Sequence, residues 1–457
     1  MNSRLAPGNH ARAVGFIILS LMPVPRISMG TGGRAHDVGI RANSLYSAKI
    51  AAPEGGEYVV EMQAQALGTS WEIPGKECAV LQLIVDGKYD QHIFLFHGGR
   101  SSVYAFLLGP LAQGEHTLEI TWDRSWARDL DDSPNIERVT LRQLDGPNAE
   151  REAILHAPVL HLRKDTIGLF SDVPLLVYWE SQPEGDATRI TYTVIFSNED
   201  GGTREDQLMA RWGRTTDIEW CFSYVKGEDL TLEYFQGRNH SKLPFRGSHE
   251  GKHAVLFDAT PNNTFADLLL DPAPVRVRMV PIAVSLQNVA RESVMDRYPW
   301  TYAIMARELE REGKTEEPPD PVTEKTSDPR NYAYLEACAT QRGTEIYFEI
   351  EIKGQSRWYA SDHSNPESRI DRSGCFRSAV ELPRDTRIGD LQRLRIYCLP
   401  APVPADEKPV PSPSVELVSL NRVFLLSPEY EPGRNLLESK INRKLKPGNS
   451  LTLDFPR

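Results

Sequence analysis

The central part of the chain, residues 156–267, holds its densest mixture of acidic, imidazole and aromatic side chains. Asp217 and Glu219 stand two residues apart there, with Ile218 between them and Trp220 after them. On a strand, both carboxyl groups would lie on one face and the two apolar side chains on the other. Paired carboxylates can split into an acid and a base, or bind a divalent cation. The alternative is a solvated strand face above a buried Ile218 and Trp220, as in any half-buried strand.

Three histidines, His240, His249 and His253, lie around a long loop that follows these carboxylates. His249 and His253 have the spacing of a helix, but nearby glycines disfavour a helix and therefore a metal-binding helical pair. A folded-back loop could still bring one imidazole to Asp217 or Glu219. We therefore predict Asp217, Glu219 and His253 as catalytic and His240 as ligand-binding. The alternative is a set of ordinary loop histidines.

Aromatic residues of the first third suggest a second kind of site. Trp71, Tyr104, Trp122 and Trp126 could form a platform on which a sugar ring stacks. The alternative is that they belong to the core, as most scattered aromatic residues do.

No cofactor is expected from the motifs. The segment 198–202, Asn-Glu-Asp-Gly-Gly, offers oxygen ligands and is compatible with a divalent cation such as calcium. It lacks the spacing of a calcium-binding loop, so a hairpin turn is the preferred interpretation. The chain has no glycine-rich phosphate loop after a strand, no nucleophile elbow and no His-Glu-x-x-His helix.

The elements that must position these groups are mostly strands. Alternation of apolar and polar residues predicts strands at 57–66, 79–85, 117–122, 189–197, 230–234, 346–353, 394–398 and 415–426. Residues 298–309 show apolar residues at helical spacing after Pro299, with Gly313 as the stop, which predicts a helix packed on a sheet. The fold class is therefore mainly β, with multi-domain antiparallel β-sandwiches and one or two helices after the central domain.

Five regions follow from this pattern. We expect a signal peptide or disordered N-terminus at 1–36, a jelly-roll-like sandwich at 37–147, a central β-rich domain ending in a helix at 148–313, a linker at 314–328, and a C-terminal β-domain with a Pro-rich loop 400–414 at 329–457.

The N-terminus and the charge limit location and partners. Arg4 and Arg12 precede an apolar run at residues 13–24. This run is too short to span a bilayer and fits the apolar part of a secretory signal. We therefore expect a secreted, periplasmic or cell-surface protein without a transmembrane segment; a disordered tail or a misplaced start codon is the alternative. The chain has 52 basic and 63 acidic residues, a formal charge of −11, which disfavours nucleic-acid binding. The oligomeric state is left open.

Cysteines give one further expectation. The chain has five, and no pair has the close spacing of a zinc or redox motif. In an exported protein, one bridge among Cys338, Cys375 and Cys398 is expected, without a choice of pair; the alternative is buried thiols.

Two resemblances extend this interpretation. The runs Gly-Glu-Tyr-Val-Val at 56–60 and Gly-Glu-His-Thr-Leu-Glu-Ile at 114–120 resemble strands of a carbohydrate-binding-module jelly roll. The central stretch resembles the vacuolar-protein-sorting-protein-sixty-two-like family, whose order of motifs is matched by residues 156–161, 190–192, 217–220, 233–240 and 252–259. The tryptophan of the family's Asp-Trp-Glu run is displaced here, and Asn262-Asn263-Thr264-Phe265 replaces its His-Ala-Ser-Tyr ending. This resemblance implies a β-rich fold and no established reaction.

Taken together, the sequence predicts an exported protein that binds glycan or another cell-envelope component. The alternative is a carbohydrate-active hydrolase or lyase that uses the carboxylates and a loop histidine of the central domain.

Overall fold

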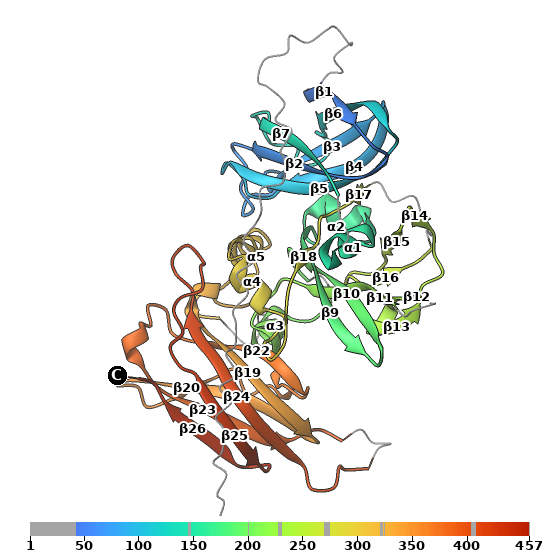
Figure 1. Ribbon diagram of the computed structural model, residues 1–457. Coiled ribbons are helices and arrows are strands. Elements are labelled where there is room, and N and C mark those ends of the chain that lie inside the picture. The colour runs from blue at the N-terminus through green and yellow to red at the C-terminus, as the bar shows by residue number, and fades with distance from the viewer. Residues whose placement is uncertain are drawn as a thin grey trace, which may run out of the picture.

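The structure is a computed structural model that describes residues 43–144, 148–199, 201–226, 231–268, 275–319, 323, 325–403 and 408–456. The predicted signal segment, and parts of the predicted linker and Pro-rich loop, lie outside these residues. Three β-rich bodies follow one another along the chain, with the central body between the other two (Figure 1). The predicted fold class, mainly β with multi-domain sandwiches, is confirmed.

The first body is a sandwich of two antiparallel sheets, with strand orders β1-β6-β3-β4 and β5-β2-β7. Its strands are β1 (Ser44–Ala52), β2 (Gly56–Gln65), β3 (Ala79–Val85), β4 (Lys88–Leu95), β5 (Ser102–Leu111), β6 (Gly114–Trp122) and β7 (Asn135–Gln143). The predicted buried face of β2 is confirmed, because Val60, Met62 and Ala64 are fully buried.

The central body contains a six-stranded sheet, β13-β12-β11-β10-β9-β18, and a second sheet, β14-β15-β8-β17, with β16 paired to β15. Most pairs are antiparallel, but β15 runs parallel to β8 and β18 runs parallel to β9. Its strands are β8 (Val159–Leu162), β9 (Pro174–Glu184), β10 (Ala187–Phe196), β11 (Ile218–Lys226), β12 (Thr231–Gly237), β13 (Ser241–Pro244), β14 (His249–Glu250), β15 (His253–Asp258), β16 (Phe265–Ala266), β17 (Val275–Val277) and β18 (Ile282–Ala283).

Helices cover the central body and its junctions. They are α1 (Ala149–Leu155), α2 (Lys164–Leu169), α3 (Glu205–Trp212), α4 (Ser293–Arg297) and α5 (Trp300–Arg311). The predicted helix is confirmed as α5, in which Tyr302, Met305 and Leu309 are fully buried. The prediction missed α1, α2 and α3, which are six to eight residues long. The hairpin predicted at 198–202 is wrong, because the chain leaves β10 there and enters α3.

The C-terminal body is a sandwich of sheets β22-β19-β24-β25 and β21-β20-β23-β26. Its strands are β19 (Tyr332–Arg342), β20 (Thr344–Ile352), β21 (Trp358–Ala360), β22 (Gly374–Glu381), β23 (Leu391–Pro400), β24 (Ser414–Leu425), β25 (Ser439–Leu445) and β26 (Ser450–Asp454). Four short 3-10 helices complete the described elements, at Arg238–His240, Pro329–Asn331, Pro366–Ser368 and Ile388–Asp390.

The three bodies are joined by apolar contacts as well as by the chain. One apolar cluster runs from the first sandwich through β9 into α5, joining Phe106, Val177 and Ile304. Another joins the central body to the C-terminal sandwich through Met305 and Tyr334. Each body therefore has its own sheets, as expected for separate units, but the apolar cores of neighbouring bodies are continuous.

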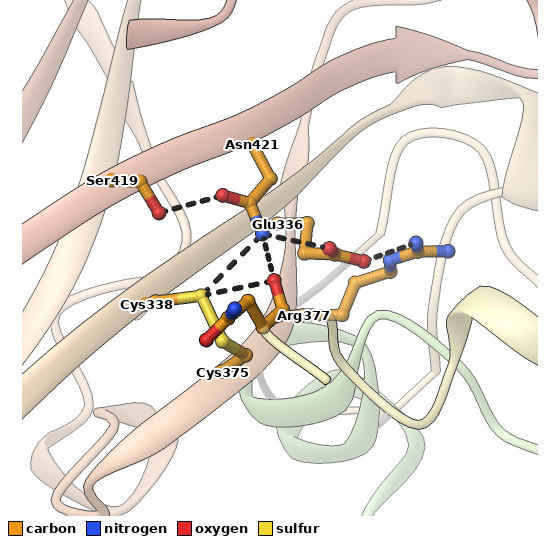
Figure 2. The surroundings of a disulfide bond; sticks show 7 residues. Glu336, Cys338, Cys375, Arg377, Ser419 and Asn421 are labelled. Atoms are coloured by element: carbon orange, nitrogen blue, oxygen red, sulfur yellow. Dashed lines mark hydrogen bonds and ion pairs between the residues drawn. A yellow bond between two sulfur atoms is a disulfide. The ribbon is translucent and has the colours of Figure 1, made fainter. Parts of the chain in front are cut away.

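A disulfide and a buried ion network lie where the C-terminal sandwich meets the central body. Cys338 on β19 bonds to Cys375 on β22, which confirms a bridge among the three candidate cysteines and leaves Cys398 as a buried thiol (Figure 2). Beside it, Asn421 Nδ2 donates to Glu336 Oε1 at 3.1 Å and to the carbonyl of Asn288 at 2.9 Å.

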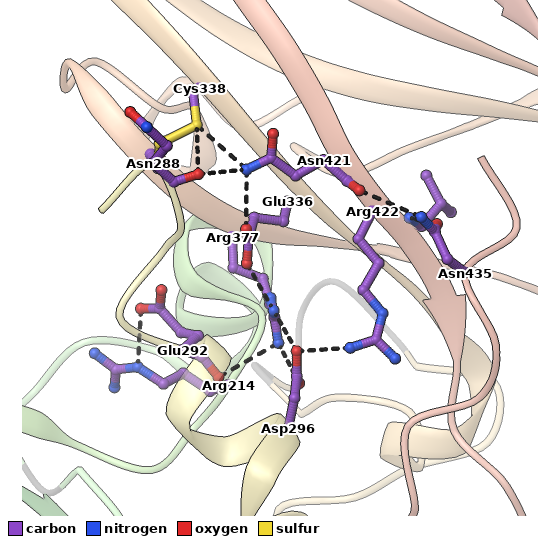
Figure 3. Close-up of polar contacts among 12 residues, drawn as sticks. Arg214, Asn288, Glu292, Asp296, Glu336, Cys338, Arg377, Asn421, Arg422 and Asn435 are labelled. Atoms are coloured by element: carbon purple, nitrogen blue, oxygen red, sulfur yellow. Dashed lines mark hydrogen bonds and ion pairs between the residues drawn. A yellow bond between two sulfur atoms is a disulfide. The ribbon is translucent and has the colours of Figure 1, made fainter. Parts of the chain in front are cut away.

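Arg377 is the centre of the ion network (Figure 3). Its guanidinium is fully buried and donates to both carboxylate oxygens of Asp296 on α4, each at 2.7 Å, and to Glu336 Oε2 at 2.9 Å. Arg422 also pairs with Asp296, at 2.9 Å. A buried charge is costly unless it is paired, so this network favours one fixed docking of the C-terminal sandwich on the central body.

None of the helices in the described part of the chain is both long and apolar enough to cross a membrane.

Candidate functional site

The predicted carboxylate pair lies inside the central body rather than on a wet face. Asp217 directly precedes β11, where its carbonyl accepts from the backbone N–H of Phe196, and Glu219 is the second residue of that strand. Asp217 is 1% exposed and Glu219 is 7% exposed. The solvated strand face is therefore excluded, and each carboxyl group must be satisfied by protein partners.

Amide side chains supply these partners. Asn263 Nδ2 donates to Asp217 Oδ2 at 2.9 Å and to Asp172 Oδ1 at 3.0 Å. Gln236 Nε2, from the end of β12, donates to Glu219 Oε2 at 2.6 Å.

The pKa values of the two carboxyl groups are shifted in opposite directions. Burial raises the pKa of Asp217 well above its usual range, and the negative charges of Glu219 and Glu199 raise it further. Burial also raises the pKa of Glu219, but the hydrogen bond of His240 and the charge of Arg291 outweigh it, and the pKa falls below its usual value. The opposite shifts favour the proton of the pair on Asp217 and the negative charge on Glu219.

His240 is the imidazole that reaches this pair. Its Nδ1 lies 3.3 Å from Glu219 Oε2 and 2.7 Å from Gln236 Nε2, and its Nε2 lies 2.8 Å from Asn262 Nδ2. The hydrogen bond to Glu219 raises the pKa of His240 above its ordinary value of 6.5. Its side chain is 48% exposed, so the ring connects the buried carboxylate to solvent.

His253, the third predicted catalytic residue, has other partners. It opens β15 and is 1% exposed. Its Nδ1 lies 2.7 Å from the carbonyl of Ala157, and its Nε2 lies 3.5 Å from Glu57 of the first sandwich. No contact described here joins it to Asp217 or Glu219, so the structure does not bring these three residues together.

The four predicted sugar-stacking residues are mostly enclosed. Trp71 is 2% exposed, Tyr104 is 5% exposed and Trp122 is 6% exposed, while Trp126 lies partly buried beside Gly168 of α2. Arg124 stacks on Trp122 at 4.2 Å, and Trp122 also lines a surface cavity of about 380 Å³. The four rings do not share one exposed platform.

A different set of aromatic residues lines a cleft between the first sandwich and the central body. Phe96 and His97 follow β4, and Trp300 is the first residue of α5. The rings of Phe96 and Trp300 stack with centroids 4.9 Å apart, and His97 meets Trp300 edge to face at 4.8 Å. Tyr104, from the predicted platform, packs against Phe96 at 5.4 Å.

The cleft encloses about 260 Å³. Its other walls are mostly apolar residues of β4, β5, β9, β17 and the segment after β17, among them Ile93, Val103, Phe106, Leu176, Val277, Met279 and Val280, and they also include Gln91, His92 and Arg278. Val103 is 57% exposed at its mouth, while Phe96, His97 and Trp300 are each partly exposed. Phe96 and Trp300 therefore keep part of their apolar surface accessible.

His97 gives the cleft a neutral polar group. Burial, together with the charge of Arg100, lowers the pKa of its imidazole to about 4, so the ring is uncharged at neutral pH. The backbone N–H of His97 donates to the hydroxyl of Tyr104 at 3.1 Å, which fixes the turn after β4.

The sequence analysis missed this cleft. Tyr298-Pro299-Trp300 stood out only as the start of a packing helix, and Phe96-His97 was not singled out at all. The signal for Trp300 was its place outside the buried stripe of Tyr302, Met305 and Leu309.

Among the described residues, no group of three or more His, Cys, Asp or Glu side chains is placed to hold a metal ion.

No family model matches the chain, and no curated protein matches it. The resemblance of the central stretch to the vacuolar-protein-sorting-protein-sixty-two-like family is thus without support from these comparisons.

Among solved structures, the chain is similar to the C-terminal domain of EclA, a sugar-binding protein, with 12% identity, a TM-score of 0.18 and coverage of 25% of this chain and 85% of that one. It is also similar to a family 35 carbohydrate-binding module from Clostridium thermocellum, with 16% identity, a TM-score of 0.17 and coverage of 21% and 68%. A ruminal GH26 endo-β-1,4-mannanase matches at 10% identity and a TM-score of 0.18, over 23% of this chain and 19% of the enzyme. TM-scores this low support no conclusion about function.

Proposed function

We propose that the protein is an exported glycan-binding protein whose binding site is the aromatic cleft between the first sandwich and the central body. The observation that carries the proposal is the stacked, partly exposed pair of Phe96 and Trp300 at the wall of a cavity of about 260 Å³. Aromatic rings bury the apolar face of a sugar while its hydroxyls remain free for hydrogen bonds.

The size and chemistry of the cleft limit the ligand. Its volume is at the small end of pockets for small molecules, which run from roughly 300 to 1,000 Å³. This suits one or two sugar units, such as the end of a glycan chain. Because His97 is neutral and the guanidinium of Arg278, which also lines the cleft, is already paired with Glu250, we expect a neutral saccharide rather than a strongly acidic one.

Export is supported by cysteine chemistry. The disulfide between Cys338 and Cys375 persists in oxidising compartments and is rare in reducing ones. Together with the apolar run at 13–24, it favours a secreted, periplasmic or cell-surface location.

The test is binding of the whole protein to a panel of soluble oligosaccharides, with neutral manno-, xylo- and cello-hexaose beside acidic oligogalacturonate. Trp300→Ala removes half of the stacked pair, so we expect the Kd for a neutral ligand to rise by roughly 30-fold, the loss of about 2 kcal/mol typical of a central aromatic contact.

Trp358→Ala is the matched control. Trp358 is also a partly buried tryptophan at the surface of the protein, but it lies on β21 of the C-terminal sandwich, under Arg395 at 4.0 Å. Its removal should leave the Kd unchanged. Absence of binding to every member of the panel, or equal losses for the two variants, would contradict the proposal.

A further inference from the structure

We propose that His240, oriented by Glu219, is the general base of a hydrolytic site on the central body that cleaves acyl esters of saccharides. The assignment of a saccharide as the alcohol portion of the ester rests on the proposed function. The assignment of catalysis rests on the carboxylate–imidazole pair itself, which lies outside the aromatic cleft.

Among the histidine–carboxylate pairs of the described residues, this pair has the largest difference in exposure with the imidazole as the more exposed partner. His249 with Glu233, at 33% and 21%, and His363 with Glu381, at 31% and 20%, have the same order with a smaller difference. His240 is 48% exposed, whereas the side chain of Glu219 is 10% exposed. The pair of His92 and Asp123 is closed on both sides, at 3% and 13%. The pair of His116 and Asp86 has the reverse order, with 13% for the imidazole and 50% for the carboxylate. A fixed, desolvated carboxylate behind an open imidazole is the arrangement that proton transfer to a substrate requires.

The carboxylate is held in place from several sides. Gln236 donates to Glu219 at 2.6 Å, and the positive charge of Arg291 acts on Glu219 as well. Asp217, whose pKa burial raises well above its usual range, accepts a hydrogen bond from Asn263. Nδ1 faces Glu219 Oε2 at 3.3 Å and Gln236 Nε2 at 2.7 Å. We assign the proton of the neutral ring to Nδ1, because of these two groups only the carboxylate can accept it, and Nε2 is then the acceptor. Asn262 Nδ2 lies 2.8 Å from Nε2 and must leave this nitrogen before a water can give its proton there.

The backbone adds a second, independent observation. Asn239 and His240 both have left-handed conformations, with φ values of 59° and 55°. Two successive non-glycine residues in this region are strained, and such strain clusters at functional sites. The kink turns the ring of His240 back toward Glu219 at the start of β13, instead of letting it follow the strand.

The accessible groups decide the reaction class. Glycoside hydrolysis needs two carboxyl groups that reach the substrate. Here Asp217 is 1% exposed, and Glu219 is engaged by Gln236 and His240. One reachable imidazole backed by a carboxylate suits ester hydrolysis, in which it activates water.

The step balances without a further reagent. Nε2 of His240 takes a proton from water as the water oxygen bonds to the ester carbonyl carbon. The tetrahedral intermediate then collapses, the bond from that carbon to the sugar oxygen breaks, and the leaving oxygen takes the proton from Nε2. The products are a carboxylic acid and a sugar hydroxyl, and His240 is neutral again.

The test uses the whole protein with two probes, 4-nitrophenyl acetate and glucose pentaacetate. We expect hydrolysis of both, and a loss of roughly 100-fold or more in kcat/KM for His240→Ala, the usual share of a general base. Glu219→Gln keeps the shape of the carboxylate and should lower the rate at least about tenfold by removing the charge that orients the ring.

His249→Ala is the matched control, because His249 also pairs with a carboxylate, Glu233 at 3.1 Å, and is 33% exposed. It should leave the rate unchanged. No hydrolysis of either probe by the unmodified protein, or equal losses for the two histidine variants, would overturn the proposal. Because 4-nitrophenyl acetate carries no sugar, its hydrolysis is independent of whether the aromatic cleft binds glycan.

A pH profile separates a catalytic from a structural role. The charged groups acting on His240 are Glu219, Glu199 and Arg291, and the first of them dominates. The rate should rise with pH as the ring loses its proton, with a midpoint above 6.5, and Glu219→Gln should move that midpoint down. A profile that Glu219→Gln leaves in place would also contradict the assignment.

Discussion

At the scale of single residues, the central body shows how burial sets protonation. Asp217 directly precedes β11 and Glu219 is the second residue of that strand, yet the pKa of Asp217 is raised and the pKa of Glu219 is lowered. The difference comes from their surroundings, because Glu219 faces His240 and Gln236. Asp217 is fully buried near the like charges of Glu219 and Glu199, and the charge of Arg214 and the hydrogen bond of Asn263 do not outweigh these effects.

This assignment predicts a pH dependence of stability. The folded-state pKa of Asp217 is raised, so its contribution is fully present below its unfolded value and is lost as pH rises through the folded value. Asp217→Asn mimics the protonated form and cannot ionise. Urea denaturation should therefore show that the variant gains stability relative to the unmodified protein between pH 4 and pH 8.

Asp131→Asn is the control for this comparison, since the side chain of Asp131 is 93% exposed. Its stability relative to the unmodified protein should not change over the same range. A constant difference between Asp217→Asn and the unmodified protein at all pH values would show that Asp217 is ionised in the folded state.

At the scale of elements, residues at the ends of strands and helices position neighbouring side chains more than residues in the middle of these elements do. Gly213 ends α3 in a left-handed conformation, with φ of 62°, and donates its N–H to Met209. A Cβ at this position would lie 2.8 Å from Cγ of Arg377, the centre of the interdomain ion network. One small residue therefore both stops a helix and makes room for the buried guanidinium.

Two glycine variants separate these roles. Gly185 has the same φ of 62° in the turn between β9 and β10, and a Cβ there would meet no atom within 4 Å. Gly185→Ala should cost roughly 1–2 kcal/mol, the price of a left-handed alanine. Gly213→Ala should cost clearly more in a thermal or urea unfolding experiment. Equal losses would mean that the approach of Arg377 to Gly213 contributes nothing to stability.

Elements with strong patterns could be predicted from the sequence. The strand at 79–85 was placed with the bounds of β3, and α5 was placed from its stripe of Tyr302, Met305 and Leu309. The short helices α1 to α3 were missed because six to eight residues give too few turns for a periodic signal.

The site could be predicted only in part. Residue types and order pointed to the carboxylates and to a loop histidine beside them. Which imidazole arrives depends on the path of the loop, and the left-handed pair Asn239 and His240 gives no periodic signal. The cleft could not be predicted for a different reason. Phe96 and Trp300 come from different bodies, and tertiary contacts that leave no local sequence pattern bring them together.

At the scale of the whole molecule, direct contacts between the three bodies hold them in fixed positions, so the bodies are not joined by the chain alone. The ion network around Arg377 and the apolar cluster through Tyr334 hold the C-terminal sandwich, and Arg276 bridges to Asp90 and Glu250 at the first junction. Arg311 of α5 lies 3.8 Å from Glu77 of the first sandwich, and one apolar cluster includes residues of both, so the walls of the cleft are formed before any ligand binds.

The central claim is that one sugar end is held jointly by the first sandwich and the start of α5. The most direct measurement is a crystal structure of the whole protein with the neutral oligosaccharide that binds best in solution. We predict a sugar ring within contact distance of both Phe96 and Trp300. A ligand bound elsewhere on the protein, with the aromatic cleft empty at saturating concentration, would contradict this account.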